Sequence, residues 1–324
     1  MNLIDLHNRI AKYLRIGVTD RCNLRCRYCM PAEGIDFAHR DDILNYEEII
    51  RLAKIFAALG VDKVRLTGGE PFVRRDIDVL LKSLTKIFAR VHITTNATLL
   101  HDYIDLLEEV NIRSINISID SLDRDRFFMI TRRDSFEVVM QNILKCIERG
   151  LPTKLNIVVM KGVNDMEILD FVRFGMKHNV EVRFIEAMPF NDDDGNRDVY
   201  MPATKIAEVI ASEYPSLHKL LADGSSSDKY LIENKYRLGI IPAYSRSLCS
   251  TCDRIRLTPK GELLNCLYSQ TGENLMSMVR DESITDKDIQ QAIIDSVLRK
   301  KKSGFEEEAL ILKDAFRSMT TIGG

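Results

Sequence analysis

Six of the seven cysteines in this chain fall into two groups of three whose spacing is typical of metal chemistry. The first group, Cys22, Cys26 and Cys29, forms the pattern C-x-x-x-C-x-x-C. Three thiolates can bind three irons of a 4Fe–4S cluster and leave the fourth iron open for a substrate. Zinc is the alternative, but a structural zinc site needs four ligands, and the nearest further candidate is His39. The pattern therefore favours a catalytic iron–sulfur site.

The second group of cysteines lies far along the chain, where Cys266 follows Cys249 and Cys252. The residues between Cys252 and Cys266 predict a β-hairpin with its turn at residues 259–261. Three cysteines again favour a cluster with one open iron, whereas a distant fourth ligand could complete a zinc site. The spacing alone does not decide between these two metals.

The seventh cysteine, Cys146, stands apart from both groups. It lies on an expected helix over residues 135–149, beside Ile143 and Ile147. Free cysteine is among the residue types that are most often buried. We therefore expect Cys146 to be a structural thiol with no part in the chemistry.

The composition excludes several classes of protein. A formal net charge of −2 over 324 residues argues against a protein that binds nucleic acid over a large surface. No apolar run is long enough to span a bilayer, and residues 1–10 lack the apolar stretch of a signal peptide. We expect a soluble, cytoplasmic protein that binds neither nucleic acid nor a membrane.

Expected strands and helices alternate along the first part of the chain. Strands are expected at residues 13–18, 63–67, 91–95, 114–119, 154–160 and 181–186, with helices at 45–59, 76–90, 102–110, 135–149 and 165–178. Asn45 and Glu48 predict a capping box at the first helix. Alternating strands and helices predict a parallel sheet, and six units are fewer than the eight of a closed barrel. The fold class is therefore α/β, an open, partial (βα)6 TIM-type barrel over residues 1–190 with a C-terminal extension over 191–324, and a doubly wound sheet is the alternative.

Within several of these strands, polar and apolar side chains alternate. Ile115, Ile117 and Ile119 share one face of their strand, for example, and the polar residues between them share the other. If the helices cover the apolar face, the polar face must line the inside of the barrel. That interior would contain the basic residues Arg15, Lys63, Arg65, Lys154 and Arg183. We expect a wide cavity for a polar anion; the alternative is a solvent-facing sheet, because a shift of one residue would exchange the two faces.

Two motifs together resemble the radical S-adenosylmethionine superfamily. One is the first cysteine motif with Tyr28 inside it, and the other is T-G-G-E-P at residues 67–71, which ends the second expected strand. The resemblance implies that the first cluster binds and reductively cleaves S-adenosylmethionine. It also implies that the glycine loop contacts the methionine amino group of this cofactor.

Further motifs resemble one family within that superfamily, the GTP 3′,8-cyclases of molybdenum-cofactor biosynthesis. They are C-x-x-C-x-R-x-R-L-T-x-x-G at 249–261, V-R-L-T-G-G-E-P at 64–71, K-L-N-I-V-V at 154–159, R-F-I-E-A-M-P at 183–189 and the closing I-G-G at 322–324. The resemblance implies conversion of GTP to (8S)-3′,8-cyclo-7,8-dihydroguanosine 5′-triphosphate with two 4Fe–4S clusters and S-adenosylmethionine. It also implies a homodimer, an electron donor of the flavodoxin or ferredoxin type, and cyclic pyranopterin monophosphate synthase as the next enzyme.

The same resemblance assigns the site residues one by one. The ligands of the second cluster would be Cys249, Cys252 and Cys266. The contacts to S-adenosylmethionine would be Tyr28, Gly69, Ser118 and Met188. The contacts to GTP would be Arg15, Arg65, Thr95, Lys154, Arg254, Ile255 and Arg256. The tail, Gly323 and Gly324, would reach into the active site of its own chain.

Two other functions stay open from the sequence. One is a radical S-adenosylmethionine enzyme that modifies a peptide and carries an auxiliary cluster. The other is a non-catalytic iron–sulfur or zinc module. The two arginines on the expected hairpin, Arg254 and Arg256, disfavour the peptide-modifying enzyme.

Overall fold

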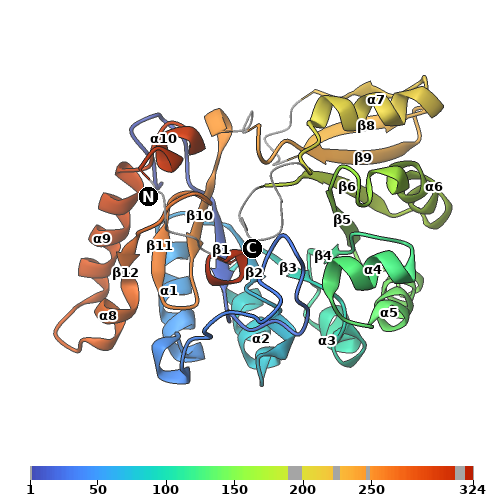
Figure 1. The fold of residues 1–324 in the computed structure, drawn as a ribbon. Coiled ribbons are helices and arrows are strands. Elements are labelled where there is room, and N and C mark those ends of the chain that lie inside the picture. The colour runs from blue at the N-terminus through green and yellow to red at the C-terminus, as the bar shows by residue number, and fades with distance from the viewer. Residues whose placement is uncertain (1, 189–198, 222–226, 246–248, 311–317, 324) are drawn as a thin grey trace.

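One sheet of twelve strands organises the part of the chain that the structure describes (Figure 1). The structure is a computed structural model, and it describes residues 2–188, 199–221, 227–245, 249–310 and 318–323. The strand order is β12-β11-β10-β1-β2-β3-β4-β5-β6-β9-β8-β7, and the sheet does not close on itself. The expected open, largely parallel α/β sheet is therefore confirmed.

Eight neighbouring strands, from β10 to β9, run parallel, and the strands outside them are antiparallel. The first six are β1 Tyr13–Gly17, β2 Lys63–Thr67, β3 Arg90–Thr95, β4 Ser114–Ser118, β5 Thr153–Val159 and β6 Glu181–Glu186. Each lies within one residue of its expected position. The others are β7 His218–Lys219, β8 Asp228–Ile232, β9 Tyr236–Ile241, β10 Arg254–Leu257, β11 Glu262–Leu264 and β12 Glu273–Asn274.

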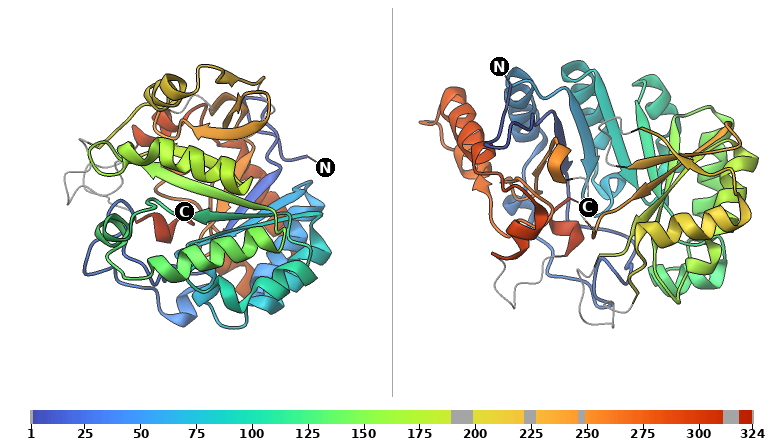
Figure 2. Two further views of the ribbon diagram at one scale, coloured as in Figure 1. Left: turned by 90° about the vertical axis from the view of Figure 1, so that its right-hand side faces the viewer. Right: turned by 90° about the horizontal axis from the view of Figure 1, so that it is seen from above.

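Most of the helices cover the outer side of the curved sheet (Figures 1 and 2). The described helices are α1 Tyr46–Ala58, α2 Ile77–Ile87, α3 Ile104–Glu109, α4 Arg124–Thr131, α5 Phe136–Glu148, α6 Ile168–His178, α7 Ala203–Glu213, α8 Leu275–Arg280, α9 Asp286–Leu298 and α10 Gly304–Glu308. The capping box of α1 is present: Glu48 N donates to Asn45 Oδ1 at 2.8 Å, and Asn45 N donates to Glu48 Oε2 at 2.7 Å. Helix α4 was not expected from the sequence. No described helix has the length and apolar character that a membrane crossing requires.

The region beyond residue 190 extends the same sheet at both ends. Strand β9 pairs with β6, and β10 pairs with β1 on the opposite side of the barrel strands. The expected hairpin is formed by β10 and β11, and Gly261 N donates to Thr258 O at 2.9 Å in its turn. The hairpin therefore places Arg254 and Arg256 directly beside β1.

The alternation in the strands separates the core from the concave face. Leu14 and Ile16 of β1 are completely buried in the core, whereas Arg15 between them lines a cavity. Because the helices cover one face and a cavity occupies the other, the doubly wound alternative does not hold. Cys146 is completely buried in this core on α5, as expected for a structural thiol.

Candidate active site

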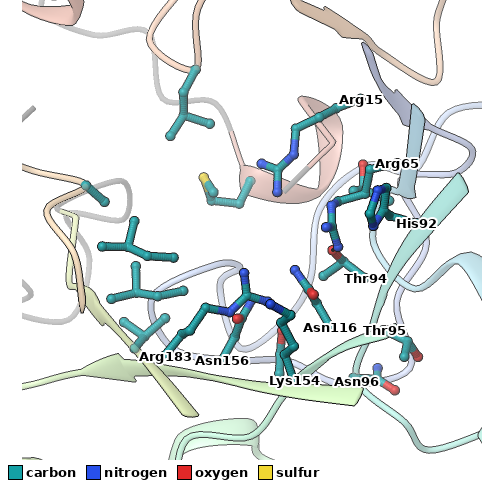
Figure 3. A pocket seen from close by; sticks show the side chains of 18 of the residues that line it. Arg15, Arg65, His92, Thr94, Thr95, Asn96, Asn116, Lys154, Asn156 and Arg183 are labelled. Atoms are coloured by element: carbon teal, nitrogen blue, oxygen red, sulfur yellow. The ribbon is translucent and has the colours of Figure 1, made fainter. Parts of the chain in front are cut away.

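The polar face of the sheet lines a cavity of about 650 Å³ (Figure 3). All five basic residues that the alternation placed in the interior line it: Arg15, Lys63, Arg65, Lys154 and Arg183. The alternative of a solvent-facing sheet is therefore wrong. Polar strand residues from β1 to β6 face one shared space, and it is large enough for an organic ligand of cofactor size.

The first cysteine group lies at one end of this cavity. Cys22, Cys26 and Cys29 all line it, in the loop that follows β1. Helix α4 holds the loop, because Arg25 N donates to Thr131 O at 2.9 Å and Arg27 N donates to Ile130 O at 3.0 Å. The thiols are thus fixed by backbone contacts and face the ligand space.

The glycine loop packs directly on the cysteine loop. Gly69 N donates to Thr19 O and Glu70 N donates to Arg21 O, each at 2.8 Å. A Cβ atom on Gly69 would lie 2.2 Å from Arg21 O, so only glycine fits between these backbones. The two motifs that the resemblance paired are therefore in contact.

Glu70 joins this loop to the end of β3. Its carboxylate accepts hydrogen bonds from Thr95 Oγ1 at 2.7 Å and from Asn96 N at 2.6 Å. Asn96 Nδ2 in turn lies 3.6 Å from Cys22 Sγ. Burial raises the pKa of Glu70 to about 7 despite these donors. The sequence places Glu70 within the T-G-G-E-P motif but indicates no role for it.

The first three thiols suit an iron–sulfur cluster. Burial raises the pKa of Cys22 to about 11 and that of Cys29 to about 12, so cluster assembly must displace protons there. Leu24 N donates to Cys22 Sγ at 3.4 Å, and such hydrogen bonds to sulfur tune the potential of iron–sulfur clusters. Within the described ranges, no three His, Cys, Asp or Glu side chains are gathered closely enough to hold a single metal ion.

The residues expected to contact S-adenosylmethionine lie together. Tyr28, Gly69, Ser118 and Met188 all line the cavity that holds the first three cysteines. Tyr28 Oη donates to Asp120 Oδ2 at 2.8 Å, and burial raises the pKa of Asp120 to about 6. The structure thus brings this expected set to one end of the cavity.

The residues expected to contact GTP also share the cavity, with one exception. Arg15, Arg65, Thr95, Lys154, Arg254 and Arg256 line it. The side chain of Ile255 is completely buried in the core on the other face of β10, next to Leu14 in the strand register. Only the backbone of Ile255 could therefore contact a ligand in this cavity.

The parallel register aligns three arginines, a histidine and a serine in a row across the sheet. Arg256, Arg15, Arg65, His92 and Ser114 are successive partners on β10, β1, β2, β3 and β4. We call these five residues the basic row. Several buried polar atoms near it have no hydrogen-bond partner in the described structure, namely Nε of Arg15, both ring nitrogens of His92, Oδ1 of Asn156, and Nε and Nη2 of Arg183, although Arg183 Nε lies 3.7 Å from Glu181 Oε1 in an ion pair. Buried polar atoms are rarely left unpaired, so the cavity is built for a polar ligand.

Tyr13 is a second group in the cavity that sequence reasoning missed. Its hydroxyl accepts a hydrogen bond from Arg65 Nε, and Lys63 Nζ lies 4.0 Å from the centre of its ring. Burial disfavours the phenolate, but Arg65, Arg15 and Lys63 outweigh burial and lower the pKa of Tyr13 to about 7. The cations around Tyr13 therefore favour its phenolate form.

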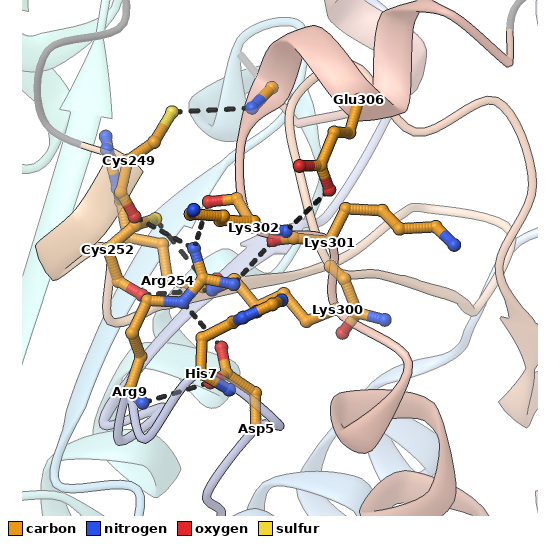
Figure 4. A network of polar contacts seen from close by, with 12 residues as sticks. Asp5, His7, Arg9, Cys249, Cys252, Arg254, Lys300, Lys301, Lys302 and Glu306 are labelled. Carbon is orange, nitrogen blue, oxygen red and sulfur yellow. Dashed lines mark hydrogen bonds and ion pairs between the residues drawn. The ribbon is translucent and has the colours of Figure 1, made fainter.

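The second cysteine group sits in a cationic network (Figure 4). Lys300 Nζ donates to Arg254 O at 2.7 Å and to Cys252 O at 3.1 Å, and it lies 3.8 Å from Cys252 Sγ. Gly304 N donates to Cys249 Sγ at 3.4 Å. Burial opposes ionisation of Cys252, but Arg254 and Lys300 outweigh it and lower the pKa of this thiol to about 7. This environment favours a bound thiolate.

Arg9 ties the second group to the start of the chain. It forms a buried ion pair with Asp5 at 2.6 Å, and its Nη1 donates to Cys249 O and to Lys302 O at 2.9 Å each. Its Nη2 donates to Lys301 O at 2.5 Å. One guanidinium therefore joins the cysteine segment to residues 301–302. Nothing in the sequence indicated this contact.

The tail reaches the same cavity beside the first cysteine group, because Met319 and Thr320 line it and Ser318 Oγ donates to Cys29 O at 2.8 Å. Gly323 O accepts hydrogen bonds from Arg256 Nη1 and from Thr67 Oγ1, each at 3.0 Å. Figure 1 shows the C-terminus at the centre of the curved sheet. Gly324 lies outside the described residues.

Comparisons with known proteins agree along most of the chain. Residues 16–175 match the Radical SAM superfamily, and residues 180–306 match Molybdenum Cofactor Synthesis C. The GTP 3′,8-cyclase of Clostridium botulinum strain Hall is 40% identical over 301 residues, which cover 91% of this chain and 93% of that protein. The GTP 3′,8-cyclase of Moorella thermoacetica is 41% identical, over 82% of this chain and 83% of that protein. Molybdenum cofactor biosynthesis protein 1 of Dictyostelium discoideum is 40% identical over 93% of this chain, which spans only 49% of that longer protein.

Solved structures share the fold at low sequence identity. SuiB of Streptococcus suis, bound to the precursor peptide SuiA, aligns with a TM-score of 0.67 and 16% identity over 98% of this chain and 72% of that chain. SuiB bound to S-adenosylmethionine aligns with a TM-score of 0.62 and 17% identity over 84% of this chain and 65% of that chain. These similarities show a common architecture alone, whereas the sequence matches extend across both regions of the chain. The chain belongs to the GTP 3′,8-cyclase family of the radical S-adenosylmethionine superfamily.

Proposed function

We propose that this chain converts GTP to (8S)-3′,8-cyclo-7,8-dihydroguanosine 5′-triphosphate in molybdenum-cofactor biosynthesis. The observation that carries the proposal is one cavity that has three cysteines at one end and the basic row along its sheet wall. A cationic wall suits a triphosphate, because arginine binds phosphate oxygens through charge-assisted hydrogen bonds. A radical enzyme for a peptide substrate has no need of such a wall.

The two ends of the cavity have separate tasks in this proposal. When bound, a 4Fe–4S cluster on Cys22, Cys26 and Cys29 and S-adenosylmethionine supply a 5′-deoxyadenosyl radical. Tyr28, Gly69, Ser118 and Met188 hold the cofactor there. Arg15, Arg65, Thr95 and Lys154 hold the nucleotide in place for the reaction.

The C-terminal region, residues 191–324, supplies a second 4Fe–4S cluster on Cys249, Cys252 and Cys266. The cations Arg254 and Lys300 beside Cys252 support this assignment, since a cluster with thiolate ligands carries negative charge. Arg254 and Arg256, on the hairpin between these cysteines, would hold the guanine nucleotide near this cluster. Residues 1–190 would form the radical-generating barrel.

The remaining proposals follow from family membership. The chain would act in the cytoplasm as a homodimer that binds neither nucleic acid nor a membrane. A flavodoxin or ferredoxin-type protein would deliver electrons, and cyclic pyranopterin monophosphate synthase would consume the product.

The direct test is the product formed under strict anaerobiosis. The reconstituted enzyme is incubated with GTP, S-adenosylmethionine and dithionite, and the nucleotides are separated and identified by mass spectrometry and NMR. We expect a 3′,8-cyclised nucleotide together with 5′-deoxyadenosine. Formation of 5′-deoxyadenosine without a new nucleotide, in an enzyme that fails to bind GTP, would favour the peptide-modifying alternative.

The substitution Arg254→Ala should lower the affinity for GTP about tenfold or more, because a hydrogen bond to a charged group contributes about 1.5–3 kcal/mol. S-adenosylmethionine should still be cleaved slowly and without coupling to GTP. Calorimetric titration measures the GTP affinity. The control is Arg173→Ala, which removes an exposed arginine that pairs with Asp170 and Glu213 on the outer surface. Equal GTP affinity in both variants would show that Arg254 is not part of the GTP-binding site.

The substitution Arg9→Leu should deplete iron at the second cysteine group, because three backbone carbonyls around Cys249 lose their common donor. Reconstituted wild type should hold about eight irons per chain, and the variant about four. Iron analysis measures this difference, and 5′-deoxyadenosine formation should persist. The control is Arg149→Leu, which removes a surface arginine paired with Asp105 and Glu108. Full iron content in Arg9→Leu would show that the segment holds its shape without this guanidinium.

A further inference from the structure

His92 is a buried histidine, the fourth of the five residues of the basic row, and its ring nitrogens have no hydrogen-bond partner in the described structure. It lies on β3 between Arg65 of β2 and Ser114 of β4, and it lines the cavity (Figure 3). The residue is 9% exposed, and both ring nitrogens lack a hydrogen-bond partner in the described structure. Buried donors and acceptors without a partner are rare in folded proteins, because each has given up its hydrogen bonds to water. The geometry therefore indicates that a ligand supplies the partner.

The charges around His92 are almost all positive. Lys63 and Arg65 face it from β2, Lys154 from β5 and Arg90 from its own strand. The residues of β4 in the cavity wall, Ser114, Asn116 and Ser118, are uncharged, and Arg113 also lines the cavity. Two acidic groups lie beyond the cations: the Tyr13 hydroxyl accepts a hydrogen bond from Arg65 Nε, and Glu181 pairs with Lys154 at 2.6 Å. Burial, followed by the charges of Arg65, Lys63, Arg90 and Lys154, lowers the pKa of His92 to about 2.

The neutral ring is thus a consequence of burial first and of the surrounding cations second. A polyphosphate among the same cations would offset the second cause, because its negative charge compensates theirs. Protonation of the ring would then become more favourable, and an imidazolium donates a strong hydrogen bond to a phosphate oxygen. Nε of Arg15 and Nη2 of Arg183, in the same cavity, also lack a hydrogen-bond partner and point to the same kind of ligand.

We propose that His92 is a further substrate-binding residue, which donates a hydrogen bond to a phosphate oxygen of the triphosphate and takes up a proton when the triphosphate binds. The proposal rests on the proposed function, since it takes GTP as the occupant of this cavity. The direction of the pH dependence follows from a comparison of the free enzyme with the GTP complex. The ring is neutral in the free enzyme at neutral pH, and its pKa rises in the complex. The contribution of His92 to GTP affinity is therefore present at low pH and is lost as the pH rises through the pKa of the complex.

The test compares His92→Gln with the wild-type holoenzyme. Glutamine keeps a neutral N–H donor of similar reach but cannot take up a proton. GTP affinity is measured by calorimetry without S-adenosylmethionine, at about pH 6.5 and about pH 8.5, on either side of neutrality where histidine titrates. Titrations in buffers of different ionisation enthalpy give the number of protons taken up on binding. The γ-phosphate and Tyr13 also titrate, but they are present in both proteins, so the difference between the proteins reports the ring.

We expect the affinity ratio of wild type to His92→Gln to be about tenfold at the lower pH and to shrink at the higher pH, because about 1.4 kcal/mol corresponds to a factor of ten. Wild type should also take up more protons than the variant. Inorganic tripolyphosphate, which has no guanine or ribose, should show the same ratio. The control His101→Gln, in the short 3-10 helix Leu100–Asp102, should behave as wild type, since this ring is about half exposed.

Three results would overturn the proposal. Equal affinities at both pH values would show that the ring has no part in binding. If the variant loses affinity but takes up as many protons as wild type, the ring contacts the ligand in its neutral form, and its protonation is not coupled to binding. A loss for GTP that is absent for tripolyphosphate would place the contact on the nucleoside. A wild-type enzyme that binds no GTP would instead overturn the proposed function itself. If His92→Gln lowers the unfolding temperature, His92→Asn in the same titrations gives the second comparison.

Discussion

Replacing Cys22, Cys26 or Cys29 by alanine is expected to abolish the formation of 5′-deoxyadenosine. Each thiol would bind its own iron, so the loss of one removes a cluster ligand that no described side chain nearby replaces. Without the cluster no electron reaches S-adenosylmethionine, and the cleavage has no alternative route within the site. The product is measured by chromatography after addition of dithionite to the reconstituted protein.

Cys146→Ala is the matched control for these three variants. It removes the same thiol from a completely buried position on α5 that does not line the cavity. It should cost some stability through a small void, but 5′-deoxyadenosine should form at the wild-type rate. A yield near wild type from any of the three cavity variants would contradict the assignment of the first cluster.

Deletion of Gly323 and Gly324 is expected to stop cyclisation while the fold and both clusters persist. The described part of the tail contributes the carbonyl of Gly323, which accepts from Arg256 Nη1 and Thr67 Oγ1. Its removal would release an arginine of the basic row at the point where the nucleotide is expected to bind. Cyclised nucleotide should fall by more than an order of magnitude, since orientation of reactants contributes strongly to rate. Uncoupled 5′-deoxyadenosine should still form, and both products can be quantified in one assay.

A point substitution provides a second form of this test. Gly323 has a φ of 75°, and its Cβ position lies 3.0 Å from Thr67 Oγ1 and 3.3 Å from the Cα atom of Gly17. Gly323→Ala should therefore displace the tail. Gly150→Ala is matched to it, because Gly150 has a φ of 68° but nothing within 4 Å of its Cβ position. If the deletion enzyme cyclises GTP at the wild-type rate, the tail has no catalytic task.

The barrel strands could be predicted because each carries a local pattern. In β1, β2 and β4 the alternation of apolar and polar residues also identified the face that lines the cavity. The same alternation in β3 places His92 and Thr94 on one face of the strand and Val91, Ile93 and Thr95 on the other. It would have identified His92 as a cavity residue, but not Thr95, which lines the cavity at the end of the strand, where Glu70 accepts from its hydroxyl. Helix α4 was missed because Phe128 and Met129 are exposed on it, which obscures the helical period.

Other parts of the site had no local signal. The contact between Arg9 and Cys249 joins residues 240 positions apart, and its acceptor is a backbone carbonyl, which any residue type provides. The pairing of β10 with β1 likewise depends on the tertiary fold, because a four-residue strand has too few residues for a reliable pattern. Motif resemblance located the cysteines and arginines of this region, but only the structure shows which of them face the nucleotide space.

The open sheet has a consequence for solubility. A sheet that does not close leaves two edge strands, and long exposed edges recruit other chains into aggregates. Here each edge strand has only two residues, His218–Lys219 in β7 and Glu273–Asn274 in β12. Both carry a charged side chain, and Lys219 is held by Asp228 at 2.7 Å. The molecule can thus keep its barrel open for a large substrate without offering a template on which a second chain could add a strand.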